Sequence, residues 1–167
     1  AQLDELDDKT QWISKFKNLL LRRKNSNTEQ GSKRNILAHY DIGNELYERF
    51  LDCSMQYSSA IYSEDALTLS KAQQNKMKTI CERLELSESD HVVEIGTGWG
   101  GLAIFMAQHY GCHVTTTTIS DAQHELAEQR VKALSLTDKI TLLKEDYRNL
   151  SGQYDKLVSI EMIEAVG

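Results

Sequence analysis

The sequence predicts an α/β fold in which helices wrap a parallel sheet. From residue 91 onward, short apolar or β-branched runs alternate with helical segments, and this alternation is typical of parallel strands joined by helices. Four of the nine glycines lie between residues 96 and 101, directly after the first apolar run. The chain has 167 residues, of which 40% are hydrophobic and 26% charged, so it has the length and composition to bury one core.

The N-terminal part predicts a basic amphipathic helix over residues 12–24. Apolar side chains recur there at the spacing of one helical face. Residues 15–34 contain seven lysines and arginines against one glutamate, although the whole chain has a net charge of -6. The acidic total argues against a nucleic-acid partner. Two interpretations of the helix stay open, docking on its own domain or contact with an anionic lipid surface.

Two further helices are expected before the sheet. Residues 25–33 have the composition of a linker, and a helical region follows over about 36–50. Ser70 to Gln73 has the form of a capping box, and the next apolar residues keep helical spacing (Met77, Ile80, Cys81 and Leu84). The cysteines, three in number, show no metal-ligand spacing, which favours structural thiols in the cytoplasm. No stretch is long and apolar enough to span a bilayer.

The second half predicts each element of the sheet in turn. Strands are expected at 92–95, 113–119, 139–146 and 156–162, with a helix at 101–109 between the first two. Ser120 to Gln123 forms another capping box, which opens a helix with Ala122, Leu126 and Ala127 directed inward.

The glycine-rich turn after the first strand is the candidate ligand site, because ligands of such sheets collect at the carboxyl ends of the strands. Gly96, Gly98 and Gly101 satisfy G-x-G-x-x-G, a spacing shared by dinucleotide and nucleoside sites. A dinucleotide site expects an acid at the end of the second strand, which here ends in threonines and Ile119. Glu94, with the glycines through Gly100, instead resembles the S-adenosylmethionine loop of class I methyltransferases. A purely structural turn remains an alternative.

Six motifs, in order, resemble those of cyclopropane-fatty-acyl-phospholipid synthases. They are residues 39–44 (HYDIGN), 55–60 (MQYSSA), 96–103 (GTGWGGLA), 118–123 (TISDAQ), 146–148 (DYR) and 158–167 (VSIEMIEAVG). The resemblance runs from about Trp12 to the last residue. It implies S-adenosyl-L-methionine as cofactor and methyl transfer to the double bond of an unsaturated phospholipid acyl chain, with formation of a cyclopropane ring.

The resemblance also implies which residues contact the cofactor. Tyr57 and Ser58 would cover its methionine end, Gly96, Gly98 and Trp99 its centre, Thr118, Ile119 and Gln123 its ribose, and Asp146 with Tyr147 its adenine. The amide of Gln123 would then bind the ribose, as a carboxylate at the end of the second strand does in other nucleotide sites. His39 falls in a motif that packs over the pocket, where a structural role and a role in closure are both open.

Ring closure needs a base, and the family uses a bound bicarbonate for this step. The resemblance implies Glu164 as one of the residues that hold this anion. A further family contact is a cysteine, which is Ser59 here, and a histidine that often follows the glutamate is Ala165. These departures leave open a related carbon methyltransferase without ring closure, and a non-catalytic cofactor-binding module forms the third hypothesis.

The predicted organisation is a Rossmann-like class I methyltransferase sheet with helices on both faces and an N-terminal helical cap. Residues 1–85 would form the cap and 86–167 an incomplete cofactor-binding half, with the C-terminal strands missing. The chain is therefore expected to be a truncated form, inactive alone, with self-association through the exposed fourth strand. The substrate would be reached at the inner membrane surface from the cytoplasm.

Overall fold

A computed structural model of the chain describes residues 44–162. Along the chain the elements are α3 (Asn44–Phe50), α4 (Leu69–Arg83), β1 (His91–Ile95), α5 (Gly101–Tyr110), β2 (His113–Thr117), α6 (Asp121–Ala133), β3 (Ile140–Leu143), the short 3-10 helix η1 (Tyr147–Asn149) and β4 (Lys156–Ser159). The predicted basic helix and the His39 motif, together with Glu164 and Ala165, lie outside the described residues.

The four strands form one parallel sheet in the order β3-β2-β1-β4. The register pairs Ile95 with Thr117 and with Ser159, while Thr117 pairs with Leu143. The last residues of all four strands therefore stand in one row. The loops that follow the strands meet at this edge, which confirms the predicted α/β class and places the glycine turn in the middle of the row.

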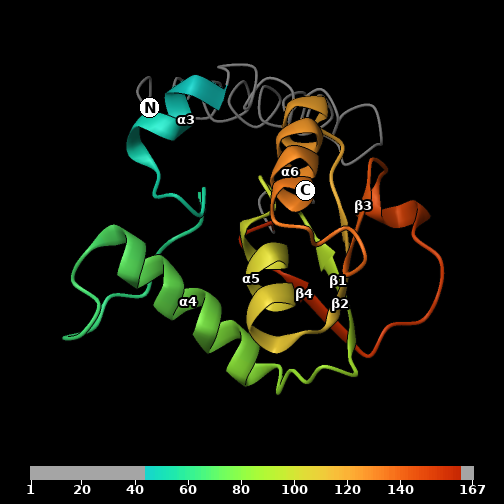
Figure 1. Cartoon of the computed structure of the whole chain (residues 1–167), viewed down its shortest axis with the longest axis horizontal. Coiled ribbons are helices and arrows are strands. Elements are labelled where there is room, and N and C mark those ends of the chain that lie inside the picture. The colour runs from blue at the N-terminus through green and yellow to red at the C-terminus, as the bar shows by residue number, and fades with distance from the viewer. Residues whose placement is uncertain (1–43, 163–167) are drawn as a thin grey trace, which may run out of the picture.

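Helices α5 and α6 connect β1 to β2 and β2 to β3, and both lie in front of the strands in Figure 1. They share a face because right-handed crossovers that advance in one direction return on the same side of the sheet. Helix α4 packs against α5. The main core contains Met77 and Cys81 of α4 together with Val92 of β1 and Met106 of α5, so the core continues across the boundary drawn at residue 85. The two-domain division stays a prediction.

Three strands are shorter than predicted. β2 ends at Thr117 because the next side chain, Thr118 Oγ1, accepts a hydrogen bond from Ser120 N at 3.2 Å and starts the turn into α6. β3 ends at Leu143, and the chain leaves the sheet before Asp146 caps η1. β4 ends at Ser159, two residues before Glu161 enters the left-handed region with a φ of 48°.

One of the two predicted helix caps is correct. Ser120 caps α6 and accepts a hydrogen bond from Gln123 N at 3.3 Å. The cap at Ser70 is wrong, since Thr68 caps α4 and accepts from Lys71 N. Gln73, the predicted partner of Ser70, instead donates its side-chain amide to main-chain carbonyls of an earlier segment.

Ala122 was expected to point inward and is exposed. The buried face of α6 instead begins at the next residue, Gln123, and continues at four-residue intervals with Ala127 and Val131. The predicted inward direction of Ala127 is confirmed.

Strand β4 pairs with β1 only, among the described strands. Its Leu157 side chain is 59% exposed, whereas Val158 is buried. Self-association through this edge stays a prediction. Within residues 44–162, no helix combines the length and the apolar character needed to cross a membrane.

Candidate functional site

The glycine turn that follows β1 is held by the neighbouring strand. Gly96 N and Thr97 N both donate to the Thr117 carbonyl at 3.1 Å. Gly96 and Gly98 have φ values of 97° and 53°, in the region that favours glycine. The turn therefore bends over the end of β2 rather than continuing the direction of β1.

A buried chain of polar side chains lies beneath this turn. Glu94 is 4% exposed, and its Oε2 accepts a hydrogen bond from Thr116 Oγ1 at 2.6 Å. Thr116 Oγ1 also lies 2.7 Å from Thr97 Oγ1. Since a hydroxyl has one hydrogen, Thr116 accepts from Thr97 when it donates to Glu94. Burial raises the pKa of Glu94 to about 8, and the hydrogen bond from Thr116 partly opposes that rise.

The glycines differ in what surrounds them. A Cβ added at Gly98 would meet nothing within 4 Å, so the main chain there faces open space. A Cβ at Gly101 would collide with the Ser54 carbonyl oxygen and lie 2.6 Å from Gln56 Nε2. Gly101 thus permits close packing with an earlier segment, while Gly98 leaves a bare main chain that a ligand could approach.

The turn between β2 and α6 presents an amide beside the glycine turn. Gln123 is 5% exposed, and its Oε1 accepts from Thr118 Oγ1 at 2.9 Å. Its Nε2 makes no hydrogen bond within residues 44–162, which leaves two N–H donors for a ligand oxygen. Ile119, half-buried, lies between these two residues in the turn.

Residues 52–59, here called the 52–59 segment, are brought to the site by side chains from two helices. Arg130 of α6 donates to the carbonyls of Cys53 at 3.0 Å, Ser54 at 3.3 Å and Trp99 at 2.6 Å. One guanidinium therefore joins this segment to the glycine turn. Figure 1 shows the segment running between α3 and α4.

Helix α4 fixes the far end of the same segment. Gln73 Nε2 donates to the carbonyls of Gln56 at 3.2 Å and Ser58 at 2.9 Å. Lys76 Nζ donates to Ser58 Oγ at 2.6 Å and to the Ser58 carbonyl at 3.2 Å. The Tyr57 side chain is 60% exposed and meets the ring of Tyr47 edge-on, with centroids 5.5 Å apart.

Trp99 contributes its indole to a second, smaller core. The side chain is 2% exposed and packs with Tyr47 and Met55. Its Nε1 donates to Asn44 Oδ1 at 2.8 Å. The indole thus joins the glycine turn to α3.

Asp146 and Tyr147 follow β3 at the same edge of the sheet. Both Asp146 oxygens accept from Arg148, at 2.8 Å from Nε and 2.6 Å from Nη2. These hydrogen bonds hold the pKa of Asp146 below its ordinary value. The Arg148 guanidinium carbon lies 5.7 Å from the centre of the Tyr147 ring.

Ser59 lies beside the end of β4. Its main-chain N–H donates to Glu161 Oε1 at 2.9 Å. Hydrogen bonding from the Ser59 side chain, and then from its main chain, holds the pKa of Glu161 below its ordinary value. The described residues contain no cluster of histidine, cysteine or acidic side chains suited to a metal ion.

The structure gathers several of the predicted residues at one edge of the sheet, although their contacts with a cofactor stay predictions and Glu164 lies outside the described residues. The glycine turn, Thr118 and Gln123 stand at the ends of β1 and β2, and Asp146 follows β3. Sequence reasoning assigned none of Gln73, Lys76 and Arg130 to the site. Each is a polar residue on the inner face of a helix, and this feature can be recognised only once the segment that packs against the helix is known.

We expect Glu94→Gln to flatten the pH dependence of stability. The pKa of Glu94 rises from 4.5 to about 8 in the folded protein, so its contribution is complete below about pH 4.5 and is lost as the pH rises to about 8. Relative to the variant, the unmodified protein should lose up to about 1.4 kcal/mol of unfolding free energy per pH unit across this window. Urea denaturation at several pH values measures the slope. The exposed Glu125→Gln variant should keep it, and an unchanged slope in Glu94→Gln would contradict the prediction.

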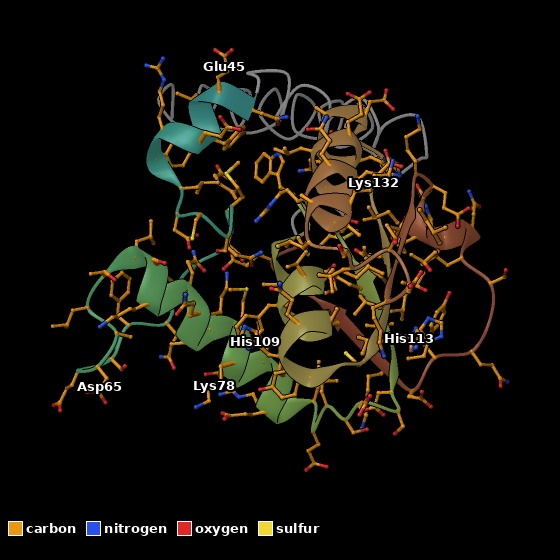
Figure 2. The ribbon with its side chains drawn as sticks, in the orientation of Figure 1. Glu45, Asp65, Lys78, His109, His113 and Lys132 are labelled. Atoms are coloured by element: carbon orange, nitrogen blue, oxygen red, sulfur yellow. The ribbon has the colours of Figure 1, made fainter. Side chains whose placement is uncertain are left out.

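We expect Arg130→Met to destabilise the fold and to loosen the 52–59 segment. The substitution leaves three main-chain carbonyls without their guanidinium donor, at a cost of about 1–3 kcal/mol for each buried group left unsatisfied. Denaturation together with amide hydrogen exchange over this segment measures both effects. Lys132→Met is the control, because Lys132, labelled on α6 in Figure 2, is 61% exposed. Equal stability of the two variants would refute the role of Arg130.

Comparison with known proteins places this chain in a family. A family model described as mycolic acid cyclopropane synthetase matches residues 27–167. The cyclopropane-fatty-acyl-phospholipid synthase of Escherichia coli (strain K12) is 48% identical over 129 residues, which are 77% of this chain and 32% of that protein. The tuberculostearic acid methyltransferase of Mycobacterium tuberculosis is 42% identical over 143 residues, 81% of this chain and 33% of that protein.

A solved structure shows the same fold. The mycolic acid cyclopropane synthase crystallised with SAH and CTAB superimposes with a TM-score of 0.75 at 27% identity, over 79% of this chain and 46% of that one. This likeness confirms the predicted Rossmann-like fold. The chain spans about a third of the length of the curated relatives it matches. Since the family model covers most of its residues, the chain belongs to the mycolic acid cyclopropane synthetase family.

Proposed function

We propose that the chain is the cofactor-binding part of an S-adenosylmethionine-dependent methyltransferase. Its substrate would be an unsaturated phospholipid acyl chain, in which the double bond is converted to a cyclopropane ring. The observation that carries this proposal is the bare glycine turn at the end of β1, in a chain of this family. The phospholipid is favoured by the identity to the Escherichia coli enzyme.

The residues at the turn suit the cofactor. Gly98 leaves open space against the main chain. The amide donors of Gln123, which meet no acceptor within residues 44–162, suit the oxygens of a ribose. Glu94, whose pKa of about 8 lies near neutrality, would ionise more readily beside a cationic ligand. When bound, S-adenosylmethionine supplies an electrophilic methyl group on a positively charged sulfur.

The protein would contribute mainly by position and by excluding water. An isolated alkene is a weak nucleophile, and holding two reactants in near-attack geometry contributes on the order of 7–11 kcal/mol. The 52–59 segment, fixed by Gln73, Lys76 and Arg130, would cover the methionine end of the cofactor. The described main chain thus forms both the floor and one wall of the proposed site.

A bound bicarbonate is proposed as the base for ring closure. Ser59 N–H already donates to a carboxylate oxygen, that of Glu161, so this main-chain donor suits a planar oxyanion. Replacement of the family's cysteine by serine leaves a main-chain contact of this kind unaffected. Glu164 would be a second residue of the anion site.

A second candidate function is methylation of an acyl double bond without ring closure. The identity to the tuberculostearic acid methyltransferase favours it. Ser59 and Ala165 favour it too, because they stand where the cyclopropane synthases have a cysteine and often a histidine. Without a reductant, that reaction ends when a carbon next to the cation loses a proton, so the product keeps a double bond. A non-catalytic cofactor-binding module is the third candidate.

We expect lipids treated with the full-length protein that carries this chain to gain the mass of one CH₂ group and to resist ozonolysis. A cyclopropane has no double bond to cleave, whereas a methylated alkene of equal mass is cleaved. Mass spectrometry before and after ozonolysis, with S-adenosylmethionine as methyl donor, separates the two products. Cleavable products would favour the second candidate. Transfer to no lipid would favour the module, provided that the protein is folded.

We expect Gly98→Ala to weaken binding of S-adenosylhomocysteine at least tenfold, roughly the effect of losing 1.4 kcal/mol. The added methyl group enters the open space over the turn, and its cost to folding is only about 1–2 kcal/mol for the left-handed conformation. Calorimetric titration measures the affinity.

Gly111→Ala is the matched control for this test. Gly111 has a φ of 70° at the opposite end of α5, so the substitution strains the main chain similarly without approaching the turn. Unchanged affinity in Gly98→Ala would show that the cofactor does not lie against this main chain.

A further inference from the structure

Lys76 is a buried cation for which the proposed reaction has no direct use. It lies on α4, its side chain is 4% exposed, and its hydrogen bonds within residues 44–162 go to Ser58 alone. The described residues place no carboxylate within ion-pair distance of its Nζ. Burying an ammonium group without an ionic partner is costly, so this arrangement calls for a reason beyond stability.

The contact between Lys76 and Ser58 determines which way the serine hydroxyl can donate. An ammonium group has donors only, so Ser58 Oγ accepts from Nζ at 2.6 Å. The hydroxyl hydrogen must then point away from Lys76. Within residues 44–162 it meets no acceptor, since the bond from Lys76 is the only one made by Ser58 Oγ. A hydroxyl polarised in this way is a strengthened donor for an anionic oxygen.

We propose that Lys76 is a positioning residue that turns the Ser58 hydroxyl into a donor for the carboxylate at the amino-acid end of the cofactor. The inference rests on the proposed function, in which Ser58 covers that end. Lys76 itself does not touch the ligand. It acts through Ser58, and its positive charge adds a favourable field for the carboxylate behind the hydroxyl.

The protonation state of Lys76 provides a readout that a merely structural role would not move. Burial lowers its pKa to about 8, while the carboxylates of Glu161, beyond β4, and Asp52, in the 52–59 segment, oppose this shift. Above this pH the neutral amine has a lone pair and can accept the Ser58 hydrogen. The donor is then turned inward, so affinity for a carboxylate ligand should fall as the pH rises through about 8.

The test compares two probes that differ at the amino-acid end. S-adenosylhomocysteine carries the carboxylate, and 5′-methylthioadenosine lacks the amino-acid group. We expect Lys76→Met to weaken the first by about tenfold to a hundredfold, the range for a hydrogen bond to a charged group, and to leave the second within about twofold. Calorimetric titration of the folded variants at pH 7 measures both. Lys78→Met is the control on the same helix, because Lys78, labelled in Figure 2, is 63% exposed.

Two further variants test the mechanism. In the Lys76→Arg variant the side chain stays charged across this pH range. Between pH 7 and 9 the unmodified protein should therefore lose more affinity for S-adenosylhomocysteine than this variant does. This comparison also holds if Lys76→Met fails to fold. In a Ser58→Ala background, Lys76→Met should add little further loss, because the two residues act as one unit.

Distinct results would overturn the inference or its premise. Equal weakening of both probes by Lys76→Met would show a purely structural role, as would identical pH profiles for Lys76→Arg and the unmodified protein. If the unmodified protein binds neither probe, the proposed function is wrong and the inference falls with it.

Discussion

The hydrogen bond from Thr116 to the buried carboxyl of Glu94 is the constraint on which the site depends. A carboxyl group that is 4% exposed needs partners, and here the partner is a threonine hydroxyl on the neighbouring strand at 2.6 Å. The same hydroxyl meets Thr97 of the glycine turn. The carboxyl thus joins two strands and the turn above them into one polar unit, which explains why the sheet interior contains an acid with Thr116 beside it.

A second requirement comes from the 52–59 segment, which belongs to neither helix nor strand. Main-chain carbonyls that are turned toward the protein need donors, and none of the described strands supplies them. Gln73, Lys76 and Arg130 supply them instead, from the inner faces of α4 and α6. Polar residues on the inner face of these helices are therefore needed because they donate hydrogen bonds to the irregular main chain that packs beside them.

The parts of the fold that could be predicted from sequence are those with local causes. Glycine spacing located the turn, because positive φ is a property of single residues, and Ser120 was found as a cap because its partner Gln123 is three residues away. Thr68 was missed because Ser70 offered the same pattern two residues later. The end of β2 shows the limit of this rule, because it is set by the side-chain oxygen of Thr118 accepting from Ser120 N, and β-branched spacing alone does not distinguish a threonine that starts a turn from one that continues a strand.

Arg130 and Lys76 could not be predicted, because their partners are distant in sequence. Arg130 bonds to carbonyls of residues 53 and 54 as well as to its nearer partner at residue 99. From the sequence of their helices alone, Arg130 and Lys76 cannot be distinguished from exposed surface cations. Only the approach of the 52–59 segment, which Gly101 permits by lacking a Cβ, turns them inward.

Trp99 shows how the rigid and irregular parts of the site are coupled. Its main-chain carbonyl accepts from Arg130, its indole donates to Asn44 of α3, and its ring packs against Tyr47, with centroids 4.7 Å apart. The residue lies in the turn whose first amides are held by β2. A shift of the turn on ligand binding must therefore alter contacts with α3 and with the Arg130 guanidinium. Because that guanidinium also holds residues 53 and 54, the floor and the wall of the proposed site cannot move independently.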